Sequence, residues 1–269
     1  LFAAGGFDCL LGSPPWERIK LQEQEFFAAR HEAIAKAPNA AARRKLIEGL
    51  AAGDVGERAL HRAFADAKRD AEASGQFVRG SGRFPLTAVG DVNTYALFAE
   101  AFLRLPRAGG RAGVIVPTGI ATDDSTKAFF EEVTGKRRLA SLYDFENREG
   151  VFPEVHRSYK FALLTLGSDE AAARFVFFAT RVEHLADERR AFTLSADDVR
   201  LINPNTRTCP VFRTSDDASL TERIFGRTPV LVDDTKGFLG DPWKMRFHTR
   251  LIHMAEDSHL FMNKREMIE

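Results

Sequence analysis

The residues with the most evident chemical potential are Ser13-Pro14-Pro15-Trp16, which follow the apolar run FDCLLG at residues 7–12. Proline donates no backbone hydrogen bond and keeps the preceding residue extended, so the carbonyl groups of this segment are held away from any helix or strand ladder. The Ser13 hydroxyl adds another acceptor, and Trp16 adds a flat apolar surface. Acceptors beside an aromatic face suit a planar heterocycle that carries an amino group.

The exocyclic amine of a nucleobase is a poor nucleophile, because its lone pair is delocalised into the ring. Two acceptors that bind its two N–H bonds favour a pyramidal nitrogen and free the lone pair for in-line attack on an activated methyl group, and the proton leaves afterwards. Positioning and electrostatics therefore carry such a reaction. A base in a DNA duplex must be flipped out first, and stacking on an aromatic ring returns about 1–3 kcal/mol of that cost.

The surrounding sequence predicts an α/β protein. Residues 7–12 are expected to form a buried strand that ends at the glycine and the two prolines. From about residue 17 to 75, apolar residues recur at helical spacing among Ala, Arg, Lys and Glu, which predicts a helical insertion. Residues 76–91 are rich in glycine and basic residues and are expected to form a loop.

Helical and strand patterns alternate in the middle of the chain. We expect helices at residues 93–105 and 125–134 and strands at residues 112–116, 139–146, 159–167 and 173–178. A turn is expected at Pro106 and Gly109-Gly110. Because this alternation requires crossover connections, it predicts a mostly parallel sheet covered on both faces.

Beyond residue 180 the pattern is less regular. Ser195 is expected to cap a short helix at residues 196–202, and a second short helix is expected at residues 217–225. Residues 228–232 suggest an edge strand. No internal repeat is evident.

Composition limits the classes of protein that fit. The chain has 269 residues, 44% of them hydrophobic, and a formal net charge of zero, so it can bury a substantial core and any contact with DNA must use a local patch. Cys9 and Cys209 are far apart and form no CxxC pair, which argues against a zinc or disulfide framework and favours a reducing cytoplasm. No apolar run approaches the roughly 20 residues that a membrane helix needs, and no secretory signal opens the chain.

The ends of the sequence suggest a piece of a longer protein. The chain opens with Leu1-Phe2 directly before the first predicted strand, and its four methionines all lie at or after Met245. We therefore expect further sequence of the parent protein outside these residues.

Four blocks resemble one protein family. FDCLLGSPPWERIKLQEQEFF resembles the catalytic motif [N/D/S]-P-P-[Y/F/W] of amino-methyltransferases, as found in bacterial restriction-modification DNA methylases of the type IIG kind. The later blocks follow in the family's order, at residues 93–98 (NTYALF), 109–117 (GGRAGVIVP) and 150–161 (GVFP and SYKF). The resemblance covers residues 5–167 closely and the remainder more loosely.

The resemblance implies a fold and a domain order. Residues 1–167 would be the catalytic part, the C-terminal half of a Rossmann-like S-adenosylmethionine methyltransferase sheet with a helical insertion at about residues 17–75. Residues 168–269 would be a linker and the start of an α+β target-recognition region. The family's glycine-rich cofactor turn should precede Ser13, and Gly80-Ser81-Gly82 is no substitute because no strand leads into it. The remainder of the parent chain would then supply the cofactor-binding half, and this part alone is expected to be inactive.

The resemblance also implies a reaction and its residues. Methyl transfer from S-adenosylmethionine to adenine N6 in double-stranded DNA is implied, within a restriction-modification system that has a fused or associated nuclease. The implied catalytic residues are Ser13, Pro14, Pro15, Trp16 and Phe152, with Phe98 and Ser13 at the cofactor. Ser13 and the Pro14 carbonyl would hold the amine, and Trp16 and Phe152 would enclose the base.

Several alternatives remain open at this point. Adenine-modifying relatives mostly have Asn or Asp where this chain has Ser13, and serine there resembles enzymes that methylate cytosine N4. A non-catalytic DNA-binding or assembly module that retains the fold is a second alternative, and methylation of RNA or protein is a third. A core position is the alternative for both Phe98 and Phe152.

Charged residues outside these blocks give weaker indications. The candidate phosphate contacts are Arg79, Arg83, Lys136, Arg137, Arg138, His156 and Arg157. Charge runs usually form solvated faces, so this assignment has an ordinary alternative. Asp123-Asp124 is expected to cap the helix that follows rather than to bind a metal, and the histidines show no zinc-binding spacing.

Overall fold

The structure is a computed structural model that describes residues 5–244, 250–253 and 257–261. By its packing the chain divides into two compact units, Leu1–Pro229 and Val230–Glu269. Among the described residues, no helix combines the length and the apolar character that crossing a membrane requires.

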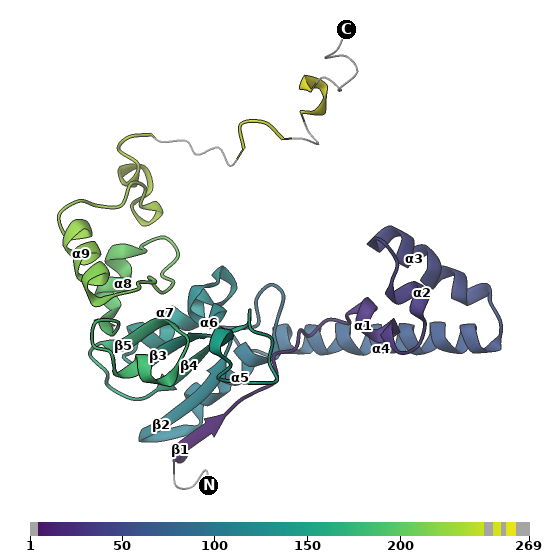
Figure 1. Cartoon of the computed structure of the whole chain (residues 1–269), viewed down its shortest axis with the longest axis horizontal. Helices are drawn as coiled ribbons and strands as arrows, with labels where there is room; N and C mark the ends of the chain where they lie inside the picture. The colour runs from purple at the N-terminus through teal and green to yellow at the C-terminus, as the bar shows by residue number, and fades with distance from the viewer. Residues whose placement is uncertain (1–4, 245–249, 254–256, 262–269) are drawn as a thin grey trace. The chain divides into compact units, whose positions relative to one another are not determined.

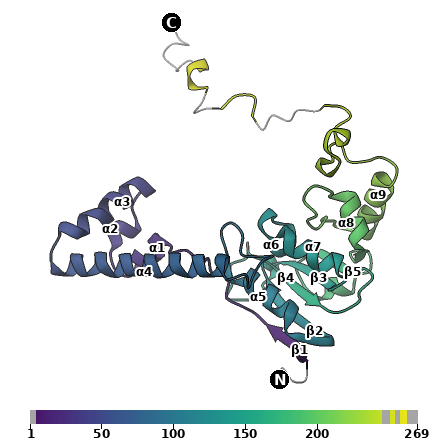
Figure 2. The same cartoon turned by 180° about the vertical axis from the view of Figure 1, so that it is seen from behind.

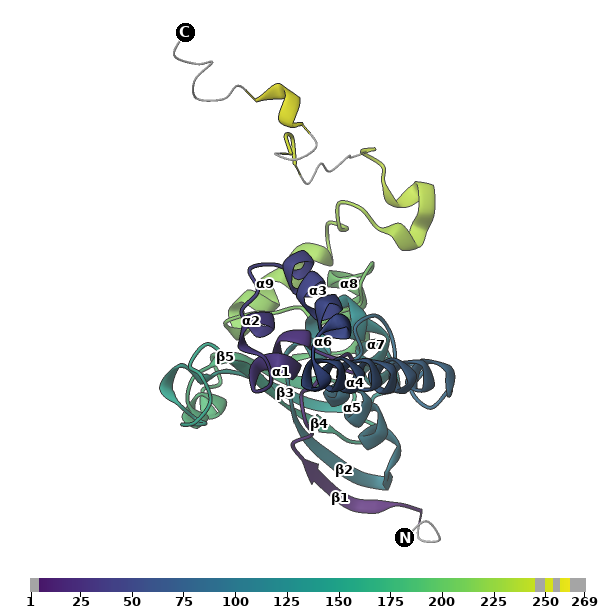
Figure 3. The same ribbon diagram turned by 90° about the vertical axis from the view of Figure 1, so that its right-hand side faces the viewer.

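Six strands of the first unit form one mixed sheet in the order β1-β2-β4-β3-β5-β6. They are β1 (Phe7–Gly12), β2 (Pro106–Val116), β3 (Leu139–Glu146), β4 (Lys160–Leu166), β5 (Ala173–Ala179) and β6 (Phe192–Leu194). β1 is parallel to β2 and β3 to β5, whereas β4 is antiparallel to β2 and β3, and β6 to β5. Figure 3 shows β1, β2, β4 and β3 side by side.

This topology confirms the predicted α/β class, but the prediction of a mostly parallel sheet is wrong: β4 lies antiparallel between β2 and β3, and β6 is antiparallel to β5. Because β2 and β3 both oppose β4, the strands β1, β2, β3 and β5 all point the same way. They end at one edge of the sheet, where β4 begins, and we call this the carboxyl edge. Segments that follow parallel strands meet at such an edge, which is where α/β sheets place ligands.

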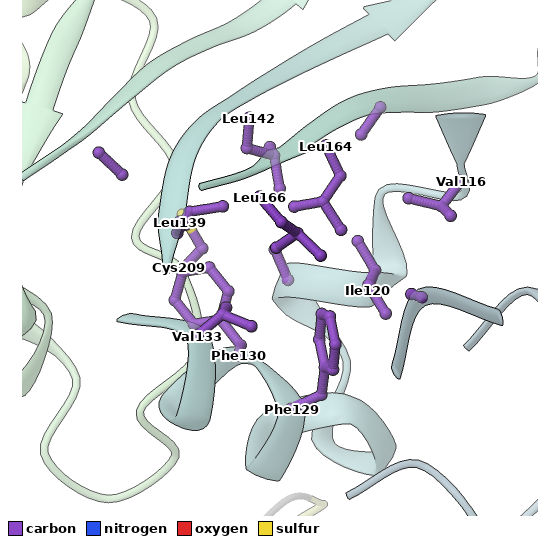
Figure 4. Close-up of a cluster of buried hydrophobic side chains, with 14 of the residues drawn as sticks. Val116, Ile120, Phe129, Phe130, Val133, Leu139, Leu142, Leu164, Leu166 and Cys209 are labelled. Atoms are coloured by element: carbon purple, nitrogen blue, oxygen red, sulfur yellow. The ribbon is translucent and has the colours of Figure 1, made fainter. Parts of the chain in front are cut away.

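Helices cover one face of the sheet. They are α5 (Thr94–Arg104), α6 (Gly119–Thr122), α7 (Lys127–Gly135), α8 (Ala196–Ile202) and α9 (Ser215–Phe225). Their apolar side chains share one buried cluster with alternate residues of the strands, as Figure 4 shows for Phe129 and Phe130 of α7 and Leu164 and Leu166 of β4. Full burial of each such side chain stabilises the fold by about 1.5–3 kcal/mol.

The opposite face of the sheet is different. Its buried cluster, which includes Phe145, Phe161 and Val176, receives no side chain from an α-helix among the described residues. Loop residues such as Trp16 pack there instead. The prediction that residues 7–12 form a buried strand is wrong, because β1 lies at the edge of the sheet, has no buried residue and leaves Leu11 78% exposed. The prediction of helices on both faces is therefore wrong for the described part of the chain. The apolar pattern of a strand indicates which of its residues are buried, but it does not indicate whether a helix or a loop covers them.

The predicted helical insertion is confirmed (Figures 1 and 2). It contains α1 (Glu23–Ala28), α2 (Glu32–Ala35), α3 (Ala40–Gly49) and α4 (Val55–Gly80). It has a small core of its own, Phe27, Ile34, Ile47, Leu50 and Phe64. A capping box between Asp54 and Glu57 begins α4.

Two boundaries differ from the prediction. The loop expected from residue 76 begins only after α4 ends at Gly80, because Val78 is buried against Val92 and Leu97 and so extends the helix. The strand expected from residue 112 begins at Pro106, since Phe7 already pairs with Pro106. The expected turn there is wrong.

The glycines expected in that turn form an irregularity inside β2. Phe7 pairs with Pro106 and Cys9 pairs with Arg111, so the register between β1 and β2 shifts between these two pairs. A side chain at Gly110 would place its Cβ 2.5 Å from the Phe7 carbonyl oxygen, so this close approach of two strands requires glycine.

Towards the end of the first unit, one expected element is present and one is absent. Ser195 caps α8 and forms a capping box with Asp198, as predicted. Residues 228–232 form no strand, so the expected edge strand is wrong; Pro229 lacks a backbone donor, and the division between the two units falls directly after it.

In the second unit, the described residues include two short 3-10 helices, Asp234–Gly240 and Ser258–Leu260. The Asp233 side chain accepts a hydrogen bond from the Thr235 backbone N–H at 3.1 Å at the start of the first. The two units differ in content, since the sheet and all of the α-helices named above lie in the first.

Candidate active site

The carboxyl edge brings together the segments that the sequence singled out. Residues 13–16 follow β1, Pro117 follows β2, residues 147–159 link β3 to β4, and Tyr159 directly precedes β4. The site is therefore built from loops on strands whose register the core fixes.

The N-terminus of α5 holds the segment of residues 13–16 in place. The Thr94 hydroxyl donates to the Pro15 carbonyl at 2.6 Å and accepts from the Glu17 backbone N–H at 3.1 Å. The Asn93 side-chain amide donates to the Trp16 carbonyl at 3.4 Å, while its oxygen caps α5 through the Tyr95 N–H. One helix start thus binds two of the carbonyls that the prolines keep out of the sheet.

Two acceptors of the segment stay unpaired within the described residues. Pro14 is buried, Ser13 and Pro15 are exposed, and no described residue hydrogen-bonds to the Ser13 hydroxyl or the Pro14 carbonyl. The Pro15 carbonyl is not available in this way, because Thr94 occupies it. The Ser13 hydroxyl and the Pro14 carbonyl are therefore the acceptors of this segment that no described residue occupies.

The ring of Trp16 has a fixed orientation. Its indole N–H donates to the Ile115 carbonyl of β2 at 3.3 Å, and its half-buried ring packs against the clusters on both faces of the sheet. The indole is thus fixed by a hydrogen bond at its polar edge and by apolar contacts, and it remains partly exposed.

Phe152 lies in the loop after β3 and is 38% exposed. Its ring meets Phe161 edge-on, with 4.9 Å between centroids, and Phe161 stacks on Phe145 at 5.1 Å. Phe161 belongs to the cluster on which Trp16 also packs. The two predicted base-contacting aromatics therefore rest on the same cluster, without a described contact between their rings.

Phe98 is placed less decisively. It is 44% exposed on α5, one helical turn after Thr94, and it does not line the groove beside Trp16. The structure brings it to the same helix that holds residues 13–16 but not into a formed pocket.

A groove of about 1030 Å³ borders the site. Its walls combine the residues after the proline motif, the insertion helices and the start of β4, including Trp16, Arg18, Phe26, Asn93, Tyr159 and Lys160. The lining also includes Lys20 and the carboxylates Glu17 and Glu25, so the groove carries aromatic rings and charges of both signs.

A buried carboxylate on β3 connects the segment after β2 to the end of β5. Asp144 of β3 accepts hydrogen bonds from the Thr118 hydroxyl and, at 3.1 Å, from the Phe178 backbone N–H. Burial raises the pKa of Asp144, although both hydrogen bonds act in the opposite direction. Asp144 thus fixes segments after β2 and at the end of β5, and the alternating pattern of β3 gave no sign of this role.

Cations flank an aromatic ring beside that carboxylate. Phe178 has a φ of 57°. The centroid of its ring lies 5.4 Å from Lys160 Nζ and 4.2 Å from Arg213 Cζ. Lys160 also pairs with Glu146 at 3.0 Å, and this hydrogen bond lowers the pKa of Glu146. Lys160 is therefore held at the mouth of the groove that Trp16 borders.

Other titratable groups do not extend the site. Burial raises the pKa of Cys209 well above its ordinary value, so this thiol is not an activated nucleophile. Burial, followed by the charge of Asp123, raises the pKa of Tyr95 to about 12. Among the described residues, no group of three or more His, Cys, Asp or Glu side chains is arranged to hold a metal ion.

Several candidate phosphate contacts have structural partners. Arg138 donates to the Gly167 carbonyl at 2.7 Å and to the Leu103 carbonyl at 2.9 Å. Arg79 donates to the Gly90 carbonyl at 2.9 Å. These guanidinium groups organise the chain itself.

No protein-family model and no curated protein matches the chain. Among solved structures, it is similar to the type IIG restriction endonuclease BpuSI, with 25% identity, a TM-score of 0.31, and coverage of 43% of this chain and 13% of that one. It is also similar to a type I restriction-modification methyltransferase subunit from Streptococcus thermophilus, with 12% identity, a TM-score of 0.38, and coverage of 52% and 35%. The ATP-dependent type ISP enzyme LlaBIII, bound to DNA, gives 9% identity, a TM-score of 0.36, and coverage of 70% and 12%.

These neighbours are restriction-modification enzymes, and the chain spans at most 35% of the length of any of the three. TM-scores of this size do not establish a common fold. The function proposed below rests on the residues of the carboxyl edge.

Proposed function

We propose that the chain is part of an S-adenosylmethionine-dependent DNA methyltransferase of a restriction-modification or phage-defence system. It would methylate N6 of an adenine flipped out of double-stranded DNA. The observation that carries this proposal is the pair of unpaired acceptors on Ser13 and Pro14 beside the fixed ring of Trp16. The order of the four sequence blocks supports the choice of family.

The roles of the segment follow from its geometry. The Ser13 hydroxyl and the Pro14 carbonyl accept the two N–H bonds of the base amine and turn its lone pair towards the methyl donor. Pro15 keeps the segment extended while its own carbonyl is bound by Thr94. The catalysis consists of positioning and electrostatic stabilisation, so no strong base is required.

The flipped base is enclosed by two aromatic residues. Trp16 supplies one wall, because its indole is tied to β2. Phe152 supplies the other, because its partly exposed ring stands on the Phe161 cluster. Stacking of this kind contributes about 1–3 kcal/mol per base.

The described residues do not by themselves fit the whole cofactor. Gly80 is the last residue of α4, and Ser81 and Gly82 follow it without a preceding strand, so they form no strand-turn-helix phosphate or adenosine cradle. We propose Phe98 and Ser13 as the contacts from this part of the protein. The remainder of the parent chain would provide most of the cofactor pocket, and S-adenosylmethionine would supply the activated methyl group.

The remaining assignments are proposed on the same basis. Residues 1–167 would be the catalytic part with its insertion, and residues 168–269 a linker and the start of the target-recognition region. The groove beside Trp16 would receive the DNA strand that carries the flipped base. A nuclease would be fused to or associated with the parent protein.

The decisive experiment measures methyl transfer from labelled S-adenosylmethionine to DNA by the full-length protein that contains this chain, as wild type and as Ser13→Asn. The product DNA is sequenced for N6-methyladenine and N4-methylcytosine. We expect an active wild type that yields N6-methyladenine.

Each other outcome selects an alternative. N4-methylcytosine would assign the enzyme to cytosine and explain the serine. An inactive wild type with an active Ser13→Asn variant would contradict the catalytic role of Ser13 and favour a non-catalytic DNA-binding or assembly module.

A further inference from the structure

Asn147 is a buried polar residue for which the proposed reaction gives no direct use. It directly follows β3, begins a short 3-10 helix (Asn147–Glu149) and is 0% exposed. A buried side-chain amide is unfavourable unless its donors and acceptor are paired, so the partners of Asn147 identify its role.

All hydrogen-bonding atoms of the Asn147 side chain serve one loop. Its Oδ1 accepts from the Phe152 backbone N–H at 2.9 Å. Its Nδ2 donates to the Phe152 carbonyl at 2.9 Å and to the Val155 carbonyl at 2.8 Å. An amide has two donors and an acceptor oxygen, and this loop uses them all.

The backbone of Asn147 closes both ends of the same loop. Its carbonyl accepts from the Gly150 N–H at 3.0 Å, where Gly150 has a φ of 77° and turns the chain. Its N–H donates to the Tyr159 carbonyl at 2.9 Å. Tyr159 lines the groove that Trp16 borders, so one residue fixes the loop from its first turn to the groove wall.

The consequence is clearest for Phe152. Both backbone polar groups of Phe152 are bound to a single buried side chain, and its ring stands against Phe161. A ring held in this way is ordered before a ligand arrives, which lowers the entropic cost of stacking on it.

We propose that Asn147 is a positioning residue that presents Phe152 and Tyr159 to the flipped base and its DNA strand. This inference rests on the proposed function. Asn147 does not touch the base; it acts through the loop of residues 150–159.

The test compares Asn147→Asp with Asn203→Asp in the full-length protein. Aspartate is similar in size but lacks the two N–H donors, so at position 147 it would face the carbonyls of Phe152 and Val155. Asn203 is the control, because its Nδ2 also donates to a loop carbonyl, that of Thr208 at 3.0 Å, and no described hydrogen bond joins it to residues 150–159.

Three quantities are measured: the melting temperature, kcat and KM for methyl transfer, and the fluorescence of 2-aminopurine placed at the target base. We expect Asn147→Asp to lower kcat about 100-fold and to change the 2-aminopurine signal. Asn203→Asp should leave both near wild type, with a smaller change in melting temperature, because Asn203 is less buried and loses one described hydrogen bond. Asn147→Gln, which keeps the donors and the acceptor, should recover part of kcat and guards against a misfolded aspartate variant.

A double variant identifies the route of the effect. If Asn147 acts through Phe152, adding Asn147→Asp to Phe152→Ala should cause little further loss of kcat. The inference is overturned if the wild type is active while Asn147→Asp matches Asn203→Asp in kcat and fluorescence, or if the two losses simply add. An inactive wild type would instead overturn the proposed function itself.

Discussion

The two sides of the candidate base site treat their polar groups in opposite ways. On the β1 side, the Ser13 hydroxyl and the Pro14 carbonyl stay unpaired within the described residues. On the β3 side, Asn147 pairs the backbone groups of Phe152 and Val155 internally. The difference teaches that one side leaves acceptors free of partners among the described residues, whereas the other uses its hydrogen bonds to place an aromatic ring.

The largest effect is expected from a substitution on the β1 side, at Ser13. Ser13→Ala removes an exposed acceptor that supports nothing in the fold, so the free energy of unfolding should change by less than about 0.5 kcal/mol. Methyl transfer by the full-length protein should fall about 100-fold, the size of effect seen when one preorganised hydrogen-bonding group is lost from an active site. A denaturant titration and kcat/KM measure the two quantities. Loss of stability without loss of activity would show that Ser13 is structural.

A smaller effect is expected at Thr94, through which α5 holds residues 13–16. Thr94→Val removes the hydrogen bonds to the Pro15 carbonyl and from the Glu17 N–H, and should lower the free energy of unfolding by about 1–2 kcal/mol. Because residues 13–16 then lose their anchor on α5, kcat should fall about tenfold. Thr134→Val, whose hydroxyl bonds within α7, is the control for stability. A kcat equal to that of the control would mean that the prolines alone fix the segment.

The smallest effect concerns the buried carboxylate of the β3 side. Because burial raises the pKa of Asp144 in the folded chain, the folded state binds this proton more tightly than the unfolded state. The resulting stability is present below the ordinary value of 3.8 and is lost as the pH rises through the raised pKa. Asp144→Asn should therefore flatten the decline in unfolding free energy that begins at about pH 4. The unfolding free energy of the wild type and of Asp144→Asn is measured by thermal unfolding at a series of pH values. An equal dependence on pH in the two proteins would contradict this assignment.

Periodicity was sufficient to predict most of the helices and strands, because each buries a face that its own sequence marks. It did not predict that α4 continues to Gly80 or that β2 begins at Pro106. Those boundaries depend on Val78 packing against Val92 and on Phe7 pairing with Pro106. Tertiary contacts decided both.

Some features of the candidate site could be predicted from the local sequence, and others depend on contacts between distant residues. The segment of residues 13–16 could be identified locally, because proline restricts the backbone whatever the rest of the chain does. The local sequence could not predict which carbonyl of the segment lacks a hydrogen-bond partner, because Thr94, which binds the Pro15 carbonyl, lies 79 residues away. Asn147 was missed because it stands in the polar run FENREG, where nothing in the local sequence distinguishes a buried amide from a solvated one.

The edge strand β1 has a practical consequence for work with these residues in isolation. Its outer side pairs with no described strand, Cys9 is exposed, and Leu11 is 78% exposed. An unprotected strand edge with an apolar side chain is a template for pairing with another chain, and the neighbouring thiol can lock such a pair covalently. Purified protein limited to this chain is thus expected to self-associate as its concentration rises, and a reductant and dilute samples are the conditions under which to handle it.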